Sequence, residues 1–347
     1  MVRKLVLLVC STCLILLACE LLIRYQFQAW PFESVLYVPD YLTTRDTTLR
    51  WRFSPSNGRN SLGLRNRELG PKKTGTFRIL FIGDSLLWSG ETSSGELYTA
   101  VLERRLNSHF PNDPNSFEII NAGIPGYTTY QELEFLKIYG MDMKPDLVVL
   151  GFTLNDLYYK YLHRPTNQKL LNSEPTTRLY HFNPSSFPGV LFARSYLAHE
   201  VVNRSEVIWK RILRCPIFPF ERRGDFYLAW KSYGWNQARK LIGDMQTLLT
   251  ERAISLVVVV FPVSDQVNDR YRKLDEAYVL YPQGKIQEIC DAYAIPKFDL
   301  TEPLYRNGGI TLFRDYLHLN ATGNDVVTDE LEKYLVDKLG LNTNHGK

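Results

Sequence analysis

The chain has 347 residues, of which 45% are apolar and 22% are charged, values close to the average for soluble globular proteins. This composition argues against wholesale disorder, a collagen-like repeat and a polytopic membrane protein. With 41 Lys and Arg against 37 Asp and Glu, the net charge is +4 and no basic block is long enough to follow a phosphate backbone, so nucleic-acid binding is not expected.

The first expected element is an apolar helix near the N-terminus. Residues 5–23 hold a single charge, Glu20, and a helix of this length spans roughly 28 Å, close to the thickness of a bilayer core. Because Arg3 and Lys4 precede the segment, the positive-inside rule keeps its start in the cytoplasm. We therefore expect residues 1–25 to be a single-pass signal anchor in the cell membrane, with the following residues on the periplasmic, extracytoplasmic side.

The cysteines leave two alternatives open. The sequence Leu16-Leu17-Ala18-Cys19 is similar to the lipobox of bacterial lipoproteins, so cleavage and lipidation at Cys19 compete with an uncleaved anchor. In the exported body only Cys215 and Cys290 remain, which leaves one disulfide open. This body has no CxxC pair and no His/Cys cluster with zinc spacing, so no metal and no other cofactor is implied.

The next expected elements form an alternating series. Residues 26–75 show no clear periodicity and are expected to be a lead-in that packs on the domain. The expected strands are 77–82, 117–120, 147–150, 255–261 and 295–300, and the expected helices are 96–106, 130–139, 230–250, 275–293 and 324–339. Continuous apolar strands that alternate with helices predict a parallel five-stranded sheet in a three-layer α/β/α sandwich over residues 76–342.

About seventy residues interrupt this alternation after Asp156. Residues 157–226 are rich in Tyr, Arg and Pro, with one amphipathic stretch near 192–213, and are expected to be an insertion over the site. In such sheets a ligand binds beyond the carboxyl ends of the strands. The residues that follow the first three strands are therefore the candidates for chemistry.

A serine follows the first strand in Gly83-Asp84-Ser85, where the chain turns into a helix. Glycine permits the tight turn, and a serine hydroxyl presented there at the rim of the sheet suits a nucleophile. The same residues are also a common helix cap, so this motif alone favours catalysis only weakly.

Two further polar groups follow the second and third strands. The second strand leads into NAGIPG, which ends at Gly126, and the third leads into GFTLND, which contains Asn155. The N–H groups of Ser85 and Gly126 and the side-chain amide of Asn155 are three donors that, aimed at one oxygen, would form an oxyanion hole. Each is ordinary turn chemistry when taken alone. Their joint placement after three successive strands indicates acyl transfer.

A histidine near the C-terminus completes the set. Among six histidines only His318 has a carboxylate three positions before it, Asp315, and it stands just ahead of the last expected helix. A serine hydroxyl is a poor nucleophile until a base takes its proton, and a histidine oriented by a carboxylate is the usual base. On its own, an Asp-x-x-His sequence is more often a surface turn.

The four blocks GDSLLWSG, NAGIPGY, GFTLND and DYLHLN together resemble those of bacterial members of the SGNH/GDSL hydrolase superfamily, over roughly residues 50–340. The resemblance implies a flavodoxin-like sandwich in which Ser85 is the nucleophile, His318 the base and Asp315 its orienting acid. It also implies an oxyanion hole made by Ser85, Gly126 and Asn155. The lead-in sequence NSLGLR at 60–65 resembles that of membrane-anchored members and has no chemistry assigned to it.

These observations lead to a serine esterase that hydrolyses an acyl ester, for instance an O-acetyl ester, outside the cytoplasmic membrane. Its partners would be an ester of a glycan or a lipid and the membrane itself, while its oligomeric state is open. An O-acyltransferase in envelope polysaccharide modification is an alternative, because an aromatic-rich insertion that excludes water favours an alcohol acceptor. A non-catalytic glycan-binding protein on the same fold is a second alternative.

Overall fold

The computed structural model describes residues 2–26, 43–46, 49–56, 58–89, 93–109, 117–157 and 228–339, with scattered positions between 195 and 226. The chain divides into two compact units, one made of Met1–Tyr37 with Leu162–Tyr233 and the other of Val38–Tyr161 with Gly234–Lys347. Most of the expected insertion at 157–226 lies outside the described residues, so its expected place over the site is not described either.

The first unit contains the N-terminal helix α1, Val2–Gln26, where the sequence predicts a helix. Within the described part of the chain, no helix combines the length and the apolar character needed to cross a membrane. Glu20 of α1 accepts hydrogen bonds from the Ser195 hydroxyl at 2.9 Å and from the Leu197 N–H at 2.8 Å. The unit also contains the short 3₁₀ turns η7 (Pro219–Arg222) and η8 (Leu228–Trp230).

The second unit is built around a parallel sheet of five strands. These are β3 (Phe77–Gly83), β4 (Phe117–Gly123), β5 (Leu147–Phe152), β6 (Ser255–Val260) and β7 (Lys297–Asp299), in the order β4-β3-β5-β6-β7. The three central strands are buried over nearly their whole length because helices cover both faces of the sheet. The prediction of a three-layer α/β/α sandwich with five parallel strands is confirmed.

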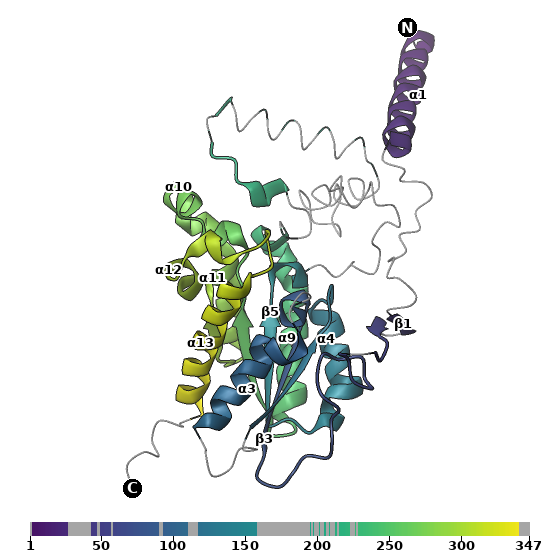
Figure 1. Ribbon diagram of the computed structural model, residues 1–347. Coiled ribbons are helices and arrows are strands. Elements are labelled where there is room, and N and C mark those ends of the chain that lie inside the picture. The colour runs from purple at the N-terminus through teal and green to yellow at the C-terminus, as the bar shows by residue number, and fades with distance from the viewer. Residues whose placement is uncertain are drawn as a thin grey trace. The chain divides into compact units, whose positions relative to one another are not determined.

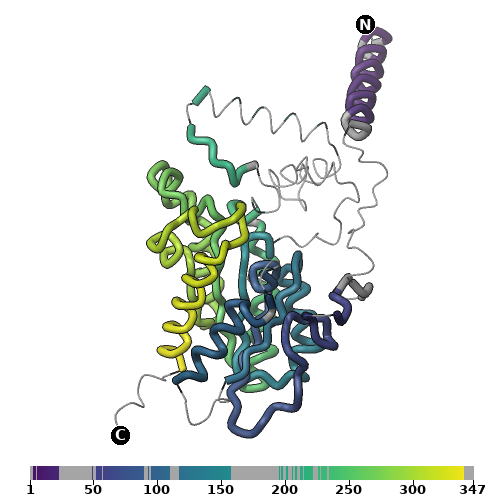
Figure 2. Tube along the Cα trace, in the orientation of Figure 1, coloured from purple at the N-terminus to yellow at the C-terminus, as the bar shows by residue number. Residues whose placement is uncertain are grey.

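Helices cover the sheet on both faces (Figure 1). They are α2 (Ser85–Trp88), α3 (Tyr98–Ser108), α4 (Thr129–Phe135), α9 (Trp235–Thr250), α10 (Asp269–Val279), α11 (Tyr281–Ala292), α12 (Thr301–Arg306) and α13 (Ala321–Lys338). On one face α3 packs against α13, and on the other α4 packs against α9. Figure 2 shows the yellow C-terminal helix returning to lie beside the blue helix that follows the first strand of the sheet.

Shorter elements connect these helices and strands. A two-stranded antiparallel sheet, β1 (Thr43–Asp46) and β2 (Arg50–Phe53), precedes the main sheet. Single helical turns lie at η1 (Ser94–Glu96), η2 (Leu136–Gly140), η3 (Met141–Met143), η4 (Leu154–Leu157), η9 (Ser232–Gly234), η10 (Ser264–Val267) and η11 (Gly309–Leu312). The turn η2 is a π-helix that continues α4 and accounts for the rest of the helix expected at 130–139.

The helix expected at 275–293 is wrong as a single element. The structure has two helices there, α10 and α11, which meet at Leu280. Pro282 lies in the first turn of α11, where its missing N–H costs nothing, whereas inside one continuous helix it would break the ladder and clash with the preceding turn. The helix expected at 230–250 begins later, at Trp235.

Glycines at the ends of three neighbouring strands let α2 pack directly on the sheet. A Cβ atom added at Gly83 would lie 2.4 Å from Leu87 Cδ1, and one added at Gly123 would lie 2.3 Å from Leu87 Cβ and 2.9 Å from the Trp88 nitrogen. In the third strand Gly151, the last residue but one, lies near the same leucine, and an added Cβ would be 3.3 Å from Leu87 Cδ1. Side chains at these positions would therefore push α2 away from the sheet.

The lead-in folds into a tight loop before β3. The Asn60 side-chain oxygen accepts hydrogen bonds from the N–H groups of Leu62 and Leu64, at 3.1 and 3.0 Å. Gly63 has a φ of +78° and lies so close to Phe53 that an added Cβ would be 1.9 Å from its carbonyl oxygen. Only glycine fits this position, because both the backbone conformation and the close approach exclude a side chain.

Candidate active site

Ser85 stands at the sharp turn between β3 and α2. The strand ends at Gly83, and Asp84 caps the helix by accepting the Leu86 N–H at 2.9 Å. Ser85 is the first residue of α2, so its hydroxyl lies at the carboxyl edge of the sheet and its side chain is partly exposed, whereas the neighbouring Asp84 is fully buried. The strand and the cap together fix the position of the hydroxyl.

His318 and Asp315 lie on a turn that closes on itself just before α13. Phe313 and Leu319 form an isolated antiparallel bridge, and the Arg314 N–H donates to the His318 carbonyl at 3.0 Å. Inside the turn, Asp315 Oδ1 accepts the His318 N–H at 2.7 Å, and Asp315 Oδ2 lies 2.8 Å from His318 Nδ1. The turn thus holds the carboxylate and the imidazole together, and the Ser264 N–H anchors it to η10 by donating to the Tyr316 carbonyl at 2.9 Å.

The imidazole of His318 bridges the carboxylate and the serine. His318 Nε2 lies 2.9 Å from Ser85 Oγ, across 233 positions of the sequence. Burial acts to raise the pKa of Asp315, but the hydrogen bonds from the N–H groups of His318 and Leu317 and from the imidazole outweigh it and lower that pKa below its usual value. The carboxylate is therefore ionised and keeps a proton on His318 Nδ1, which leaves Nε2 free to accept the serine proton.

The two candidate backbone donors lie after β3 and β4. Gly126 has a φ of +78°, and among the described residues its N–H has no hydrogen-bond partner. The N–H of Gly123, the alternative donor in the same block, is already bound to the Asn121 side-chain oxygen at 2.9 Å. Gly126 and Ser85 therefore retain N–H groups that can serve a substrate oxygen.

The side-chain amide of Asn155 lies next to the turn that carries Ser85. Asn155 is 6% exposed, and its Nδ2 donates to Asp84 Oδ2 at 3.1 Å. An amide nitrogen carries two hydrogens, so one is held by Asp84 and the second remains for another acceptor. Thr153 ends the strand side of the turn, and its hydroxyl lies 3.2 Å from Asp84 Oδ2 and contacts Asn155 Oδ1.

Two contributors were not assigned from the sequence. The sequence motif indicates only a turn at Asp84, whereas in the structure its carboxylate holds the Asn155 amide. Burial raises the pKa of Asp84, and the hydrogen bonds from Leu86, Asn155 and Thr153 act in the opposite direction. Its position between a buried strand and a polar turn was the available signal, because a buried carboxylate needs donors and the sequence places them after the adjacent strand.

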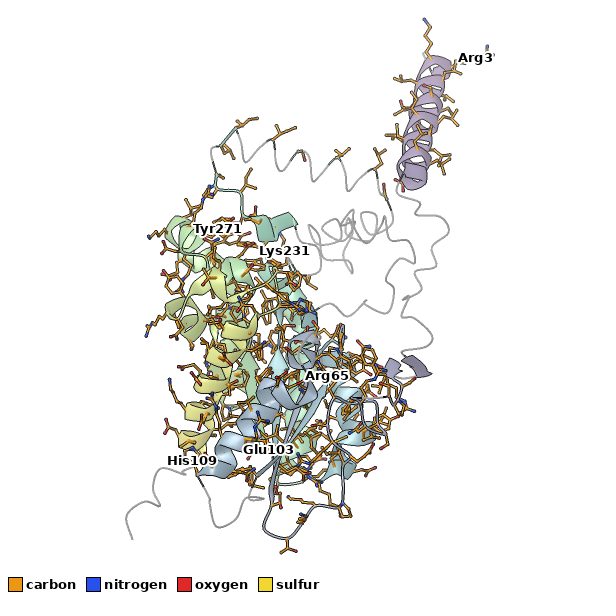
Figure 3. All side chains as sticks on the ribbon, in the orientation of Figure 1. Arg3, Arg65, Glu103, His109, Lys231 and Tyr271 are labelled. Atoms are coloured by element: carbon orange, nitrogen blue, oxygen red, sulfur yellow. The ribbon has the colours of Figure 1, made fainter. Side chains whose placement is uncertain are left out.

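The lead-in is the second contributor, through Arg65, whose side chain is labelled in Figure 3. Its Nη1 donates to the carbonyl oxygens of Trp88 and Ser89, at 2.5 and 2.7 Å, and the guanidinium lies 5.4 Å from the centre of the Trp88 ring. The ring of Phe53 stacks on Trp88 with the ring centres 4.3 Å apart. The lead-in thus holds the C-terminal end of α2, one turn after Ser85.

The same loop reaches two other elements. Asn66 donates from its side chain to the Asn121 carbonyl at 2.8 Å, at the end of β4. Arg67 pairs with Glu103 of α3 at 2.7 Å, and the Glu103 carboxylate in turn accepts the Ile119 N–H at 2.6 Å; Glu103 is also labelled in Figure 3. These contacts connect the lead-in to β4 and α3, the strand and helix beside Ser85.

The remaining titratable groups bear on cofactors and disulfides. Among the described residues no group of three or more His, Cys, Asp or Glu side chains is arranged to hold a metal ion. Cys215 and Cys290 are both free thiols, the first exposed and the second buried. Burial raises the pKa of Cys290 to about 12, which makes that thiol unreactive.

Comparison with known proteins gives one family match and several similar structures. The model of the GDSL-like lipase/acylhydrolase family matches residues 81–326. An acetyl xylan esterase, AlAXEase, is 17% identical with a TM-score of 0.46, and the match covers 74% of this chain and 99% of that one. For the lipase/acylhydrolase from Enterococcus faecalis the values are 15%, 0.42, 76% and 97%. For a variant of Axe2, an acetyl-xylooligosaccharide esterase from Geobacillus Stearmophilus, they are 16%, 0.43, 76% and 95%. The search of the curated proteins returns no match.

Proposed function

The chain belongs to the GDSL-like lipase/acylhydrolase family and is a hydrolase of ester bonds, and from this premise we propose a serine esterase mechanism centred on Ser85. The observation that carries the proposal is the continuous line of contacts from Asp315 through His318 to the Ser85 hydroxyl, at 2.8 and 2.9 Å. A hydroxyl, an imidazole and a carboxylate in this order are the groups that acyl transfer requires.

In the proposed first half-reaction, Ser85 Oγ attacks the carbonyl carbon of the ester while His318 Nε2 takes the hydroxyl proton. The negative charge that develops on the carbonyl oxygen is stabilised by the N–H groups of Ser85 and Gly126 and by the second hydrogen of the Asn155 amide. When the tetrahedral intermediate collapses, the C–O bond to the alcohol breaks, and the imidazolium returns the proton to the departing oxygen. The product of this half is an acyl-enzyme on Ser85.

In the second half-reaction water replaces the alcohol. His318 takes a proton from a water molecule as its oxygen attacks the acyl carbon, and the collapse of the second intermediate releases the free acid and restores the Ser85 hydroxyl. Asp315 stays ionised throughout and stabilises the imidazolium in both halves. The side chains of His318 and Asp315 are 29% and 49% exposed, which gives water access to the base.

Replacement of Ser85 tests the nucleophile directly. In Ser85→Ala, turnover of p-nitrophenyl acetate and covalent labelling by a fluorophosphonate should both disappear, while the circular dichroism spectrum is unchanged. Ser108→Ala, an exposed serine at the end of α3, is the matched control and should retain both signals. Undiminished turnover in Ser85→Ala would refute the assignment. Turnover of p-nitrophenyl esters from acetyl to palmitoyl by the wild-type enzyme would show which acyl chain length it prefers.

We also propose, from the sequence alone, that the enzyme acts outside the cytoplasmic membrane. The support is the apolar segment at 5–23 with Arg3 and Lys4 before it. The full-length chain should sediment with membranes and resist carbonate extraction, and a chain that begins at residue 26 should not. Recovery of the full-length chain in the soluble fraction would overturn this proposal without affecting the mechanism.

A further inference from the structure

Three carboxyl groups lie buried beneath the candidate active site. Asp84 comes from the turn after β3, Glu132 from α4 and Asp156 from η4, and their exposed fractions are 0%, 1% and 3%. None of the three forms an ion pair with a described Lys, Arg or His residue. Burying one carboxylate without a cation is costly, and three together repel one another, so this arrangement needs an explanation.

The hydrogen bonds of the three groups differ. Both oxygens of Asp84 accept hydrogen bonds, one from Leu86 and the other from the turn at Asn155. Asp156 accepts the Thr153 N–H through Oδ2 at 2.7 Å, whereas its Oδ1 has no partner among the described residues. Neither oxygen of Glu132 has a described partner. Glu132 and the free oxygen of Asp156 are thus the groups left to explain.

A shared proton joins one oxygen of Glu132 to the free oxygen of Asp156. A protonated carboxyl group is a hydrogen-bond donor, so a neutral Glu132 can donate to Asp156 Oδ1, while an ionised one can only accept. The helix α4 packs against η4, and the charge of Glu132 acts on Asp156. Burial raises the pKa of Glu132 well above its usual value, and the charge of Asp84 raises it further. Burial likewise raises the pKa of Asp156 well above its usual value, with the charges of Glu132 and Asp84 adding to the effect.

Among the described residues, the charge that raises the pKa of Glu132 is that of another carboxyl group, Asp84. From the end of β3 Glu132 meets the carboxyl group of Asp84, and from η4 that of Asp156. The buried face of α9, which packs on α4, consists of apolar or aromatic groups such as Trp235, Ala238 and Ile242. From α3, the buried Tyr98 hydroxyl interacts with Asp84, and burial raises the pKa of Tyr98 well above its usual value.

We propose that Glu132 and Asp156 share one proton, and that this pair positions the oxyanion turn 153–156 from behind. Asp156 Oδ2 folds the turn by holding the Thr153 N–H, and the Asp156 N–H donates to the Thr153 carbonyl at 3.1 Å. Glu132 holds Asp156 by donating to its other oxygen. With one shared proton the pair carries one negative charge, whereas two ionised carboxylates would carry two. The pair therefore holds the turn while placing less negative charge behind Asn155.

The charge matters because Asn155 has to stabilise a developing oxyanion. A second negative charge behind the donor would oppose the charge on the substrate oxygen in a site of low dielectric. Glu132 and Asp156 are therefore positioning residues, which act through Asn155 and do not touch the substrate. Their effect on turnover rests on the proposed function, whereas the shared proton itself does not.

The kinetic test compares three variants of the full-length protein. Glu132→Gln keeps a donor and cannot ionise, so its kcat at neutral pH should stay within about threefold of wild type. Glu132→Ala removes the donor and should lower kcat by about ten- to a hundredfold at unchanged KM, less than the loss of an oxyanion donor itself. Glu134→Gln, on the same helix but paired with Lys137 at the surface, is the matched control and should behave as wild type.

Two further readouts separate this role from a merely structural one. In wild type, kcat should fall at alkaline pH as the pair loses its proton, and Glu132→Gln should retain activity in that range. The infrared C=O band of a protonated carboxylic acid should be present in wild type at neutral pH and weaker in Glu132→Gln. The proposal is refuted if that band is unchanged in Glu132→Gln, or if Glu132→Gln lowers kcat as strongly as Glu132→Ala does. Absence of esterase activity in the wild-type protein would refute the proposed function. The infrared measurement would still show whether Glu132 and Asp156 share a proton.

Discussion

The Asp84 carboxylate and the Asn155 amide are joined by a hydrogen bond of 3.1 Å between Oδ2 and Nδ2. The bond links the residue that precedes the nucleophile to the turn after the neighbouring strand, so the serine and the amide donor are positioned by one buried group. The carboxylate holds one amide hydrogen and thereby directs the other.

Asn155→Ala should therefore lower kcat by roughly 10²- to 10³-fold with little change in KM, because the amide acts on the oxyanion more than on the bound ester. Steady-state kinetics with p-nitrophenyl acetate measure the effect. Asn307→Ala, an exposed asparagine at the end of α12, is the control. A variant in which KM rises and kcat is unchanged would show that Asn155 binds the substrate and does not stabilise the oxyanion.

Asp315→Asn should lower kcat by roughly 10⁴-fold near neutral pH, because an amide at this position no longer selects the imidazole tautomer that accepts the serine proton. Labelling of Ser85 by a fluorophosphonate should slow in parallel. Asp325→Asn, an exposed position on α13, should leave both rates unchanged. Equal labelling rates in wild type and Asp315→Asn would contradict a role for Asp315 in orienting His318.

Gly126→Ala should destabilise the protein by about 1–2 kcal/mol, because an L side chain is strained at a φ of +78°. It should also lower kcat, since relief of the strain turns the N–H away from the site. Gly284→Ala is the contrasting variant, because Gly284 lies exposed within α11 with open space around it. This replacement should stabilise the protein by about 0.5–1 kcal/mol. Urea unfolding measures both changes, and equal stability of the two variants would disprove the strain argument.

Arg65→Ala should lower kcat clearly and lower the melting temperature only slightly. The guanidinium holds the C-terminal end of α2, and Ser85 is the first residue of that helix. Arg65→Lys supplies one ammonium group in place of the planar fork and should recover only part of the loss. Added guanidinium at low millimolar concentration should restore activity to Arg65→Ala and have no effect on Arg104→Ala. Full activity of Arg65→Ala without added guanidinium would show that this contact of the lead-in is dispensable for catalysis.

The raised pKa of Glu132 sets the sign of a pH effect on stability. In the folded protein the group keeps its proton to higher pH than in the unfolded chain, where it titrates at about 4.3. Between these two values the folded state binds more protons, so the free energy of unfolding falls as pH rises. Wild type should lose stability from pH 5 to pH 8 relative to Glu132→Gln in urea unfolding. A parallel pH dependence of the two proteins would exclude a buried neutral Glu132.

The strands and the chemical blocks could be predicted because burial on both faces leaves a visible pattern. A parallel strand covered by helices is a continuous apolar run, and glycine marks its end where α2 packs, as at Gly83, Gly123 and Gly151. The break at Leu280 is hard to predict because the residues on both sides keep helical spacing, and Pro282 is the signal for the start of a new helix.

Other parts of the site could not be found in this way. Arg65 binds backbone carbonyls, which every residue possesses, so no residue type in the sequence identifies its target. Glu132 did leave a signal, since it shares the buried face of α4 with Thr129 and Phe135, and an acidic residue at such a position needs a partner or a proton. The identity of that partner depends on a turn on the neighbouring strand, which only the packing of α4 against η4 reveals.

The 233 positions between Ser85 and His318 give the enzyme an order of maturation. Ser85, Gly126 and Asn155, the proposed nucleophile and oxyanion donors, follow the three adjacent strands β3, β4 and β5, whereas His318, the proposed base, lies on the turn that leads into α13. A nascent chain therefore carries Ser85 without His318 until synthesis has passed residue 318. Under the proposed mechanism, hydrolysis requires this turn to lie beside Ser85, so the onset of activity during refolding would report the docking of the C-terminal part of the chain.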